Sequence, residues 1–279
     1  MRIFRTHTGI IVEHEKAFFR VGEENWDALV NRTGLFGLLK RELKRLQPDP
    51  ALAKYVETGL LPPIGNQEVW ACGITFVRSR QSWVEDTKET GAASSYTRVY
   101  EADRPEIFFK ATAYRTVGSG DGVRMRSDSK ITVPEPELTL FVCAEGSIEG
   151  YTIGNDMSAR DIEGENALYL SQAKCYDGSA AVGPCLYVTE SPIDPGTLIR
   201  MDVVNNGESI FSGEVSISRM KRKHTDLVSY LFKETSFRFG VYLMTGTGIV
   251  PPDNFTLAVG DEIRISIDGI GMLVNKVIK

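Results

Sequence analysis

Short apolar segments separated by turn residues fill most of the chain beyond residue 66, and they limit its fold more than any other feature. These segments are 69–76, 105–109, 138–145, 150–156, 185–191, 199–209 and 262–270. Runs this short, bounded by Gly, Pro, Asn and Asp, are typical of strands joined by turns. Asn205-Asn206-Gly207 and Ile267-Asp268-Gly269 predict hairpin turns, and one helical insertion is expected over 227–233. The expected core is therefore a β-rich sandwich or barrel.

Residues 1–66 show a mixed pattern. The apolar runs 10–12 and 17–21 predict strands. Apolar residues in 26–46 recur mostly at helical spacing, with an interruption near Thr33-Gly34. Prolines follow, and we place a boundary near Asn66. We expect a small N-terminal α/β domain over 1–66 and a main domain over 67–279, in a chain that is α+β and predominantly β.

Composition excludes several classes of protein. The 279 residues are 42% hydrophobic and 25% charged, which is ordinary for a globular chain with a large core. A net charge of −5 argues against a nucleic-acid partner. No apolar run approaches the ~20 residues that span a bilayer, so we expect no membrane partner, and the N-terminus shows no secretory signal. Four cysteines without zinc spacing predict reduced thiols in a cytoplasmic protein: Cys72, Cys143, Cys175 and Cys185.

Three carboxylates predict a metal site. Glu135 and Glu137 are separated by one residue, so a strand would place both side chains on one face. Such carboxylates repel each other unless a cation or a proton lies between them, and Mg2+ prefers oxygen ligands. Asp156 follows at a distance that allows one hairpin return, and it would complete a set of three oxygen ligands. Taken singly, the glutamates would more often be solvated and Asp156 would more often lie in a turn or helix cap.

Three further segments contain residues that could act on a substrate beside this site. Lys174 could anchor a carboxylate or act as a base, although a lysine is usually solvated. The 244–248 segment, which contains Thr247, could present N–H groups and a hydroxyl to an anion, or form a plain turn. Glu106 lies among apolar residues, and burial would raise its pKa to suit acid–base catalysis. An ion pair of Glu106 with Arg104 or Lys110 is the structural alternative.

Taken in order, these segments resemble the fumarylacetoacetate hydrolase superfamily over 67–279. The similar segments are PEIFFK (105–110), PEPEL (134–138), GYTIGNDMSARD (150–161), AKCYDG (173–178), VGPCL (182–186), MTGTG (244–248) and VGDEIRISIDGIGML (259–273). The resemblance implies a mixed β-roll in a homodimer or homotetramer. It also implies Mg2+, with Mn2+ or Ca2+ as substitutes, on Glu135, Glu137 and Asp156, and it implies that Lys174, Arg160 and Thr247 contact the substrate.

Two longer stretches, 104–138 and 161–178, resemble the sugar-acid dehydratase branch of this superfamily. This resemblance implies Mg2+-dependent loss of water from a 2-keto-3-deoxy sugar acid in pentose breakdown, with Glu106 facing the substrate. Beside a bound cation we expect the pKa of Lys174 to fall, and we leave open which of Glu106 and Lys174 is the base and which the acid. The alternative within the fold is a metal-dependent hydrolase, decarboxylase or isomerase of 2-oxo acids.

One departure from the hydrolase branch favours elimination. Those enzymes carry a lid histidine and glutamate in the pattern GxNYxxHxxE, where this chain has Ser79 and Ser82. Its histidines, His7, His14 and His224, lie away from the motifs. The pair that activates water is therefore expected to be missing, and the polar segment 81–97 is expected to close over the site instead.

Overall fold

Most of the apolar segments beyond residue 66 form strands of one large mixed sheet, while 199–209 and 262–270 belong to a second sheet. The computed structural model describes residues 1–76 and 98–279; Ser79, Ser82 and the closing segment expected at 81–97 lie outside them. The sheet is 10-stranded. Its order is β3 (Ala17–Arg20), β2 (Gly9–His14), β1 (Arg2–Thr6), β12 (Ala180–Tyr187), β10 (Ile148–Asp156), β9 (Pro136–Val142), β15 (Val241–Met244), β4 (Glu68–Gly73) and β5 (Glu106–Ala111), with β6 (Thr116–Val117) beside β12.

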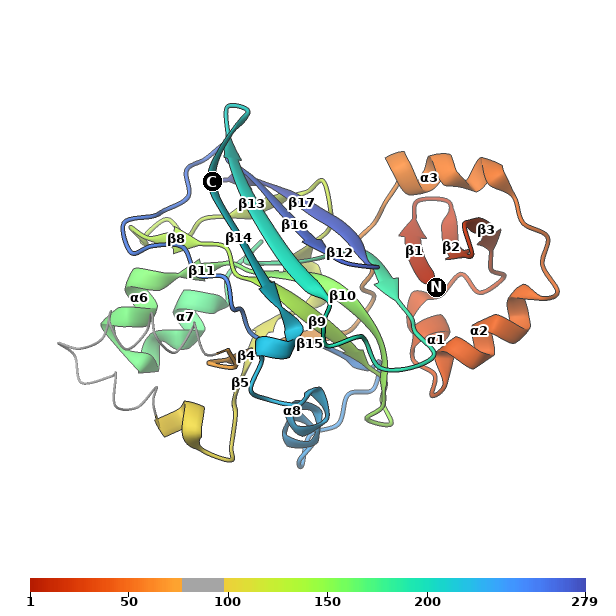
Figure 1. Ribbon diagram of the computed structural model, residues 1–279, viewed down its shortest axis with the longest axis horizontal. Coiled ribbons are helices and arrows are strands. Elements are labelled where there is room, and N and C mark those ends of the chain that lie inside the picture. The colour runs from red at the N-terminus through yellow and green to blue at the C-terminus, as the bar shows by residue number, and fades with distance from the viewer. Residues whose placement is uncertain (77–97) are drawn as a thin grey trace.

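A second, 5-stranded sheet covers one face of the first (Figure 1). It comprises β14 (Glu208–Ser216), β13 (Leu198–Asn205), β16 (Glu262–Ile267), β17 (Gly271–Ile278) and β7 (Gly122–Arg124), and a small ladder joins β8 (Thr132–Val133) to β11 (Ser158–Ala159). The predicted turn between β13 and β14 is confirmed: Asn206 and Gly207 have φ of 48° and 87°, as a two-residue hairpin turn requires.

The helices are short and lie around the sheets. Those with bounds inside the described residues are α1 (Trp26–Val30), α2 (Leu35–Leu43), α3 (Ala53–Thr58), α6 (Arg160–Glu165), α7 (Leu170–Lys174) and α8 (His224–Leu231), with 3-10 turns at Pro50–Leu52, Ala113–Arg115, Ala167–Tyr169 and Ile217–Arg219. The break expected near Thr33-Gly34 separates α1 from α2. The predicted insertion at 227–233 is α8, which begins earlier, at His224. Among the described residues, no helix combines the length and apolar character needed to span a bilayer.

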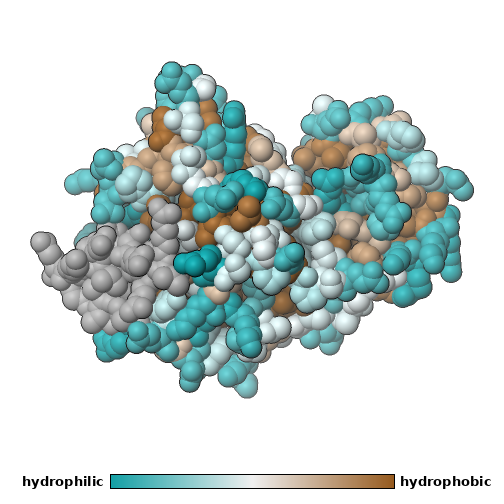
Figure 2. All heavy atoms as spheres, in the orientation of Figure 1, coloured by the Kyte–Doolittle hydropathy of each residue, from teal (hydrophilic) through white to brown (hydrophobic). Residues whose placement is uncertain are grey.

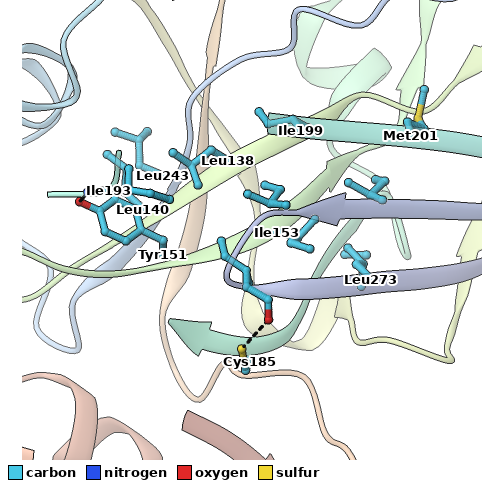
Figure 3. Packing of buried hydrophobic residues seen from close by; sticks show 14 of the residues in the cluster. Leu138, Leu140, Tyr151, Ile153, Cys185, Ile193, Ile199, Met201, Leu243 and Leu273 are labelled. Atoms are coloured by element: carbon cyan, nitrogen blue, oxygen red, sulfur yellow. Dashed lines mark hydrogen bonds between the residues drawn. The ribbon is translucent and has the colours of Figure 1, made fainter. Parts of the chain in front are cut away.

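The main core lies between the two sheets. Leu138, Leu140 and Ile153 from β9 and β10 share one buried cluster with residues of the second sheet (Figure 3). The partners labelled there are Ile199, Met201 and Leu273. Each such side chain contributes about 1.5–3 kcal/mol when it is fully removed from water, so this cluster holds β9 and β10 in place. In the view of Figure 2, the described surface is mainly hydrophilic, with hydrophobic residues in separate patches.

The N-terminal segment joins the main sheet through β1, which pairs antiparallel with β12. Trp26, Leu29 and Leu35 of the α1–α2 segment share a second buried cluster with Phe141 and Tyr242 of the main sheet. Figure 1 shows this segment, coloured red to orange, at the end of the molecule opposite α6 and α7. The division into two domains near residue 66 stays a prediction.

Strand directions explain where a site can form. β9 is antiparallel to β10 and β15, β4 is parallel to β15, and β5 is antiparallel to β4. The beginnings of β9 and β5 and the ends of β10, β15 and β4 therefore lie at one end of the sheet. Four of the motifs quoted from the sequence lie at or next to these strand ends: 105–110, 134–138, 150–161 and 244–248.

Candidate active site

Three carboxylates meet where β9 begins and β10 ends. Glu137 pairs with Gly154 across the two strands, and the backbone N–H of Asp156 donates to the carbonyl oxygen of Glu135 at 3.0 Å. One carboxylate oxygen from each of Glu135, Glu137 and Asp156 lies within 4.8 Å of the other two. The hairpin return expected from the sequence is confirmed, and it brings together the three residues predicted to hold a metal.

The electrostatics of this cluster fit a hard divalent cation. Burial, followed by the charges of Asp156 and Glu135, raises the pKa of Glu137 well above its ordinary value. Without a cation, three carboxylates this close are stable together only if a proton or a neighbouring positive charge offsets their repulsion. An all-oxygen donor set suits Mg2+ better than zinc, because zinc often takes nitrogen and sulfur ligands.

Lys174, the last residue of α7, supplies one such positive charge. Its Nζ donates to Glu135 Oε2 at 2.7 Å, to Asp156 Oδ2 at 3.2 Å and to Ser158 Oγ. Burial alone would lower its pKa, but Asp156, Glu135 and Glu163 together raise it well above the ordinary lysine value. This direction is opposite to the one expected from the sequence, because three carboxylates surround the ammonium group.

Lys110 supplies a second positive charge, and the sequence analysis did not include it among the site residues. Its side chain is 0% exposed, and its Nζ lies 2.5 Å from Asp156 Oδ1. It also donates to the carbonyl oxygens of Met157 at 2.9 Å and Lys174 at 2.5 Å. One ion-pair partner and two hydrogen-bond acceptors thus surround this ammonium group. Lys110 therefore connects β5 to Asp156 at the end of β10 and to the end of α7.

Glu106, the first residue of β5, pairs with Gly73, the last residue of β4. The ion pair considered as an alternative for it does not involve Lys110, whose ammonium contacts Asp156. Burial, opposed by Lys174, raises the pKa of Glu106 above its ordinary value. A carboxyl group in this state is suited to proton transfer.

The remaining predicted residues, Arg160 and Thr247, line one cavity together with the three carboxylates and Lys174. Arg160, at the start of α6, donates to the carbonyl oxygen of Pro251 at 3.2 Å. Thr247 is buried, and the N–H of Gly246 beside it donates to Glu137 Oε2 at 2.6 Å. The 244–248 segment thus presents an N–H group to an anion, as the sequence allowed, and this anion is a carboxylate of the protein itself.

Glu163 is a second residue that the sequence analysis did not single out. It lies one helical turn after Arg160 in α6, and its Oε2 lies 4.0 Å from Lys174 Nζ. Burial, opposed by Lys174, raises the pKa of Glu163 to about 8. The i to i+3 spacing from Arg160 was the available signal, because such residues share a helix face.

One cavity therefore contains every residue predicted to act in the site. Its lining is Cys72, Gly73, Ile74, Glu106, Phe108, Glu135, Glu137, Asp156, Arg160, Glu163, Lys174, Thr247 and Val250. Anionic groups predominate, and the cationic side chains in the lining are Lys174 and Arg160. The charges of this lining suit a divalent cation together with an anionic ligand.

Comparison with known proteins defines the class of this site. Residues 76–278 match the model of the fumarylacetoacetate (FAA) hydrolase C-terminal domain. The match covers well over half of the chain, and the chain belongs to this family.

Individual relatives within this family are dehydratases of 2-keto-3-deoxy sugar acids. The chain is 43% identical over 224 residues to a probable 2-keto-3-deoxyxylonate dehydratase of Haloferax volcanii, a match that covers 80% of this chain and 76% of that protein. It is 41% identical over 219 residues to the 2-dehydro-3-deoxy-D-arabinonate dehydratase of Saccharolobus solfataricus, covering 78% and 74%. A solved 2-keto-3-deoxy-D-arabinonate dehydratase complexed with magnesium and 2,5-dioxopentanoate is 34% identical, with a TM-score of 0.82 and coverage of 99% and 98%.

Proposed function

We propose that this protein is a Mg2+-dependent dehydratase, a carbon–oxygen lyase acting on a 2-keto-3-deoxy sugar acid. The proposed substrate is 2-keto-3-deoxy-D-arabinonate, and the products are 2,5-dioxopentanoate and water. The observation that carries the proposal is the meeting of Glu135, Glu137 and Asp156 with Lys174 and Glu106 in one cavity. Two dehydratase relatives above 40% identity support it.

Glu135, Glu137 and Asp156 would hold the cation. When bound, Mg2+ acts as a Lewis acid that polarises the 2-oxo group and makes the C3 proton more acidic. The three carboxylates lie at or beside strand ends fixed by the β9–β10 pairing, which keeps them together for a cation.

Lys174 and Glu106 would have different roles towards the substrate: Lys174 would anchor it and Glu106 would transfer a proton. Lys174 lines the cavity and places its ammonium group beside Glu135 and Asp156, and a positive charge at this position supports an anchoring role towards the substrate carboxylate. Glu106 lines the same cavity, and we assign to it the transfer of the C3 proton. Loss of that proton and of the C4 hydroxyl as water leaves a double bond between C3 and C4. Moving one proton from C5 to C3 then gives the enol of the C5 aldehyde, and the enol becomes the dioxo product. Arg160 and Thr247 would contact the substrate from the cavity wall.

We further propose a cytoplasmic protein that assembles as a homodimer or homotetramer and serves pentose catabolism. The homodimer or homotetramer is what the resemblance to the family implies. The free thiols support a reducing compartment. We retain a small N-terminal domain over 1–66 and a catalytic domain over 67–279.

A panel of 2-oxo acids tests the proposal. The purified protein with Mg2+ should form an aldehyde product from 2-keto-3-deoxy sugar acids, and it should leave acylpyruvates and oxaloacetate unchanged. Turnover of an acylpyruvate or oxaloacetate, with no action on any 2-keto-3-deoxy acid, would instead establish the hydrolase, decarboxylase or isomerase alternative. Tight binding of a sugar acid without turnover would identify a binding protein.

A further inference from the structure

Gly73 is the last residue of β4 and lies directly opposite Glu106 of β5. A Cβ atom placed on Gly73 would lie 1.9 Å from Glu106 Oε2 and 2.7 Å from Glu106 Cδ. Both distances are far below the van der Waals contact distance between non-bonded carbon atoms, about 3.5–4.0 Å. The carboxylate of Glu106 therefore occupies the volume that any side chain at position 73 would fill.

Backbone conformation does not explain the glycine at this position. Gly73 is not among the residues with positive φ, whereas the next residue, Ile74, has a φ of 53°. Left-handed conformations are unfavourable for a β-branched residue, so a glycine selected for its backbone freedom would be expected at position 74. A glycine within a strand often marks close approach by another group, and here that group is the side chain of Glu106.

We propose that Gly73 is a positioning residue, which directs the carboxylate of Glu106 into the cavity by leaving space for it over the end of β4. The proposal rests on the proposed function, because that function gives Glu106 its part in proton transfer. Both residues line the cavity that contains the three carboxylates and Lys174. A side chain at position 73 would displace a flexible carboxylate rather than backbone, so the fold can persist while Glu106 moves.

The first test measures activity in the Gly73→Ala variant. The methyl group should displace Glu106 and lower kcat by about 10²-fold, within the range associated with a general acid or base. Mg2+ affinity, measured by calorimetry, should stay within about 3-fold of the wild-type value, because Glu137 and Asp156 lie on other strands and Glu135 directly precedes one of them. Gly73→Ala should cause no further loss of kcat in a Glu106→Ala background. A kcat unchanged by Gly73→Ala, or a further large loss in the Glu106→Ala background, would overturn the proposal.

The second test uses thermal unfolding and needs no activity. Gly73→Ala should lower the melting temperature of the wild-type protein, and it should not lower that of Glu106→Ala, where the overlapping carboxylate is gone. If Gly73→Ala alone fails to fold, the double variant should recover folding. Gly22→Ala is the matched control: a Cβ at Gly22 meets nothing within 4 Å, so its effect should be small in both backgrounds.

The two tests separate this proposal from the proposed function. If the wild-type protein converts no 2-keto-3-deoxy acid, the proposed function fails. The melting temperatures of Gly73→Ala with and without Glu106 still show whether Gly73 leaves space for the Glu106 carboxylate. If Gly73→Ala lowers the melting temperature equally with and without Glu106, Gly73 does not position Glu106, and the proposal fails even in an active enzyme.

Discussion

Replacing Lys110 with methionine removes the ammonium group that the structure encloses most completely. Lys110→Met keeps a long unbranched side chain but leaves Asp156 Oδ1 without its ion-pair partner and the carbonyl oxygens of Met157 and Lys174 without their donor. Removing one partner of a buried ion pair typically costs about 3–5 kcal/mol, and buried carbonyls that lose a donor add to this loss without simple additivity. We expect the free energy of unfolding to fall by about 3–5 kcal/mol. For a chain somewhat above 250 residues this corresponds to a fall in Tm on the order of 10 °C.

Denaturant unfolding of the metal-free protein, followed by fluorescence, measures this effect. Lys40→Met is the matched control, because Lys40 and Glu190 form an exposed pair 3.6 Å apart, and such pairs contribute about 1 kcal/mol or less. Combining Lys110→Met with Asp156→Asn should cost less than the sum of the two changes, since the second substitution removes the uncompensated charge. A Lys110→Met variant as stable as Lys40→Met would refute the reasoning.

Three other predictions concern the metal and the substrate. Glu137→Gln and Asp156→Asn should each abolish Mg2+ binding in calorimetry while circular dichroism shows a folded protein; full affinity in either variant would contradict the ligand set. Because the pKa of Glu137 is raised, a proton competes with the cation, so Mg2+ affinity should fall as pH falls from above that raised pKa. Calorimetry in buffers of different ionisation enthalpy should show protons released on binding, and no release would count against the shift. Lys174→Ala should lower kcat/KM by about 10²–10⁴-fold. Lys174→Arg should retain part of the rate if Lys174 anchors the substrate carboxylate. Wild-type turnover by Lys174→Ala would exclude Lys174 both as an anchor and as a base.

Local patterns were enough to predict much of the fold. The turn at 205–207 and the break between α1 and α2 have clear local signals, and both occur in the structure. The pairing of β1 with β12 joins segments far apart in the sequence, and nothing in either strand specifies the other. The helices α6 and α7 are five or six residues long, too short to be stable by propensity alone, so tertiary packing must fix them.

The same distinction applies to the site. Glu135, Glu137 and Asp156 could be brought together in prediction because a single hairpin connects them. Lys110 could not be predicted as part of the site, because a lysine in a strand is ordinarily solvated. Its partners, Asp156, Met157 and Lys174, are also distant from it in the sequence. Gly73 was equally hidden, since its role depends on the side chain of the residue paired with it in β5.

The most direct measurement of the central claim follows 2-keto-3-deoxy-D-arabinonate by NMR with the purified protein, with and without a chelator. The proposal predicts stoichiometric formation of 2,5-dioxopentanoate with Mg2+, complete loss of turnover after EDTA treatment, and recovery when Mg2+ or Mn2+ is restored. Persistence of the substrate under saturating Mg2+, or turnover that survives exhaustive chelation, would contradict it.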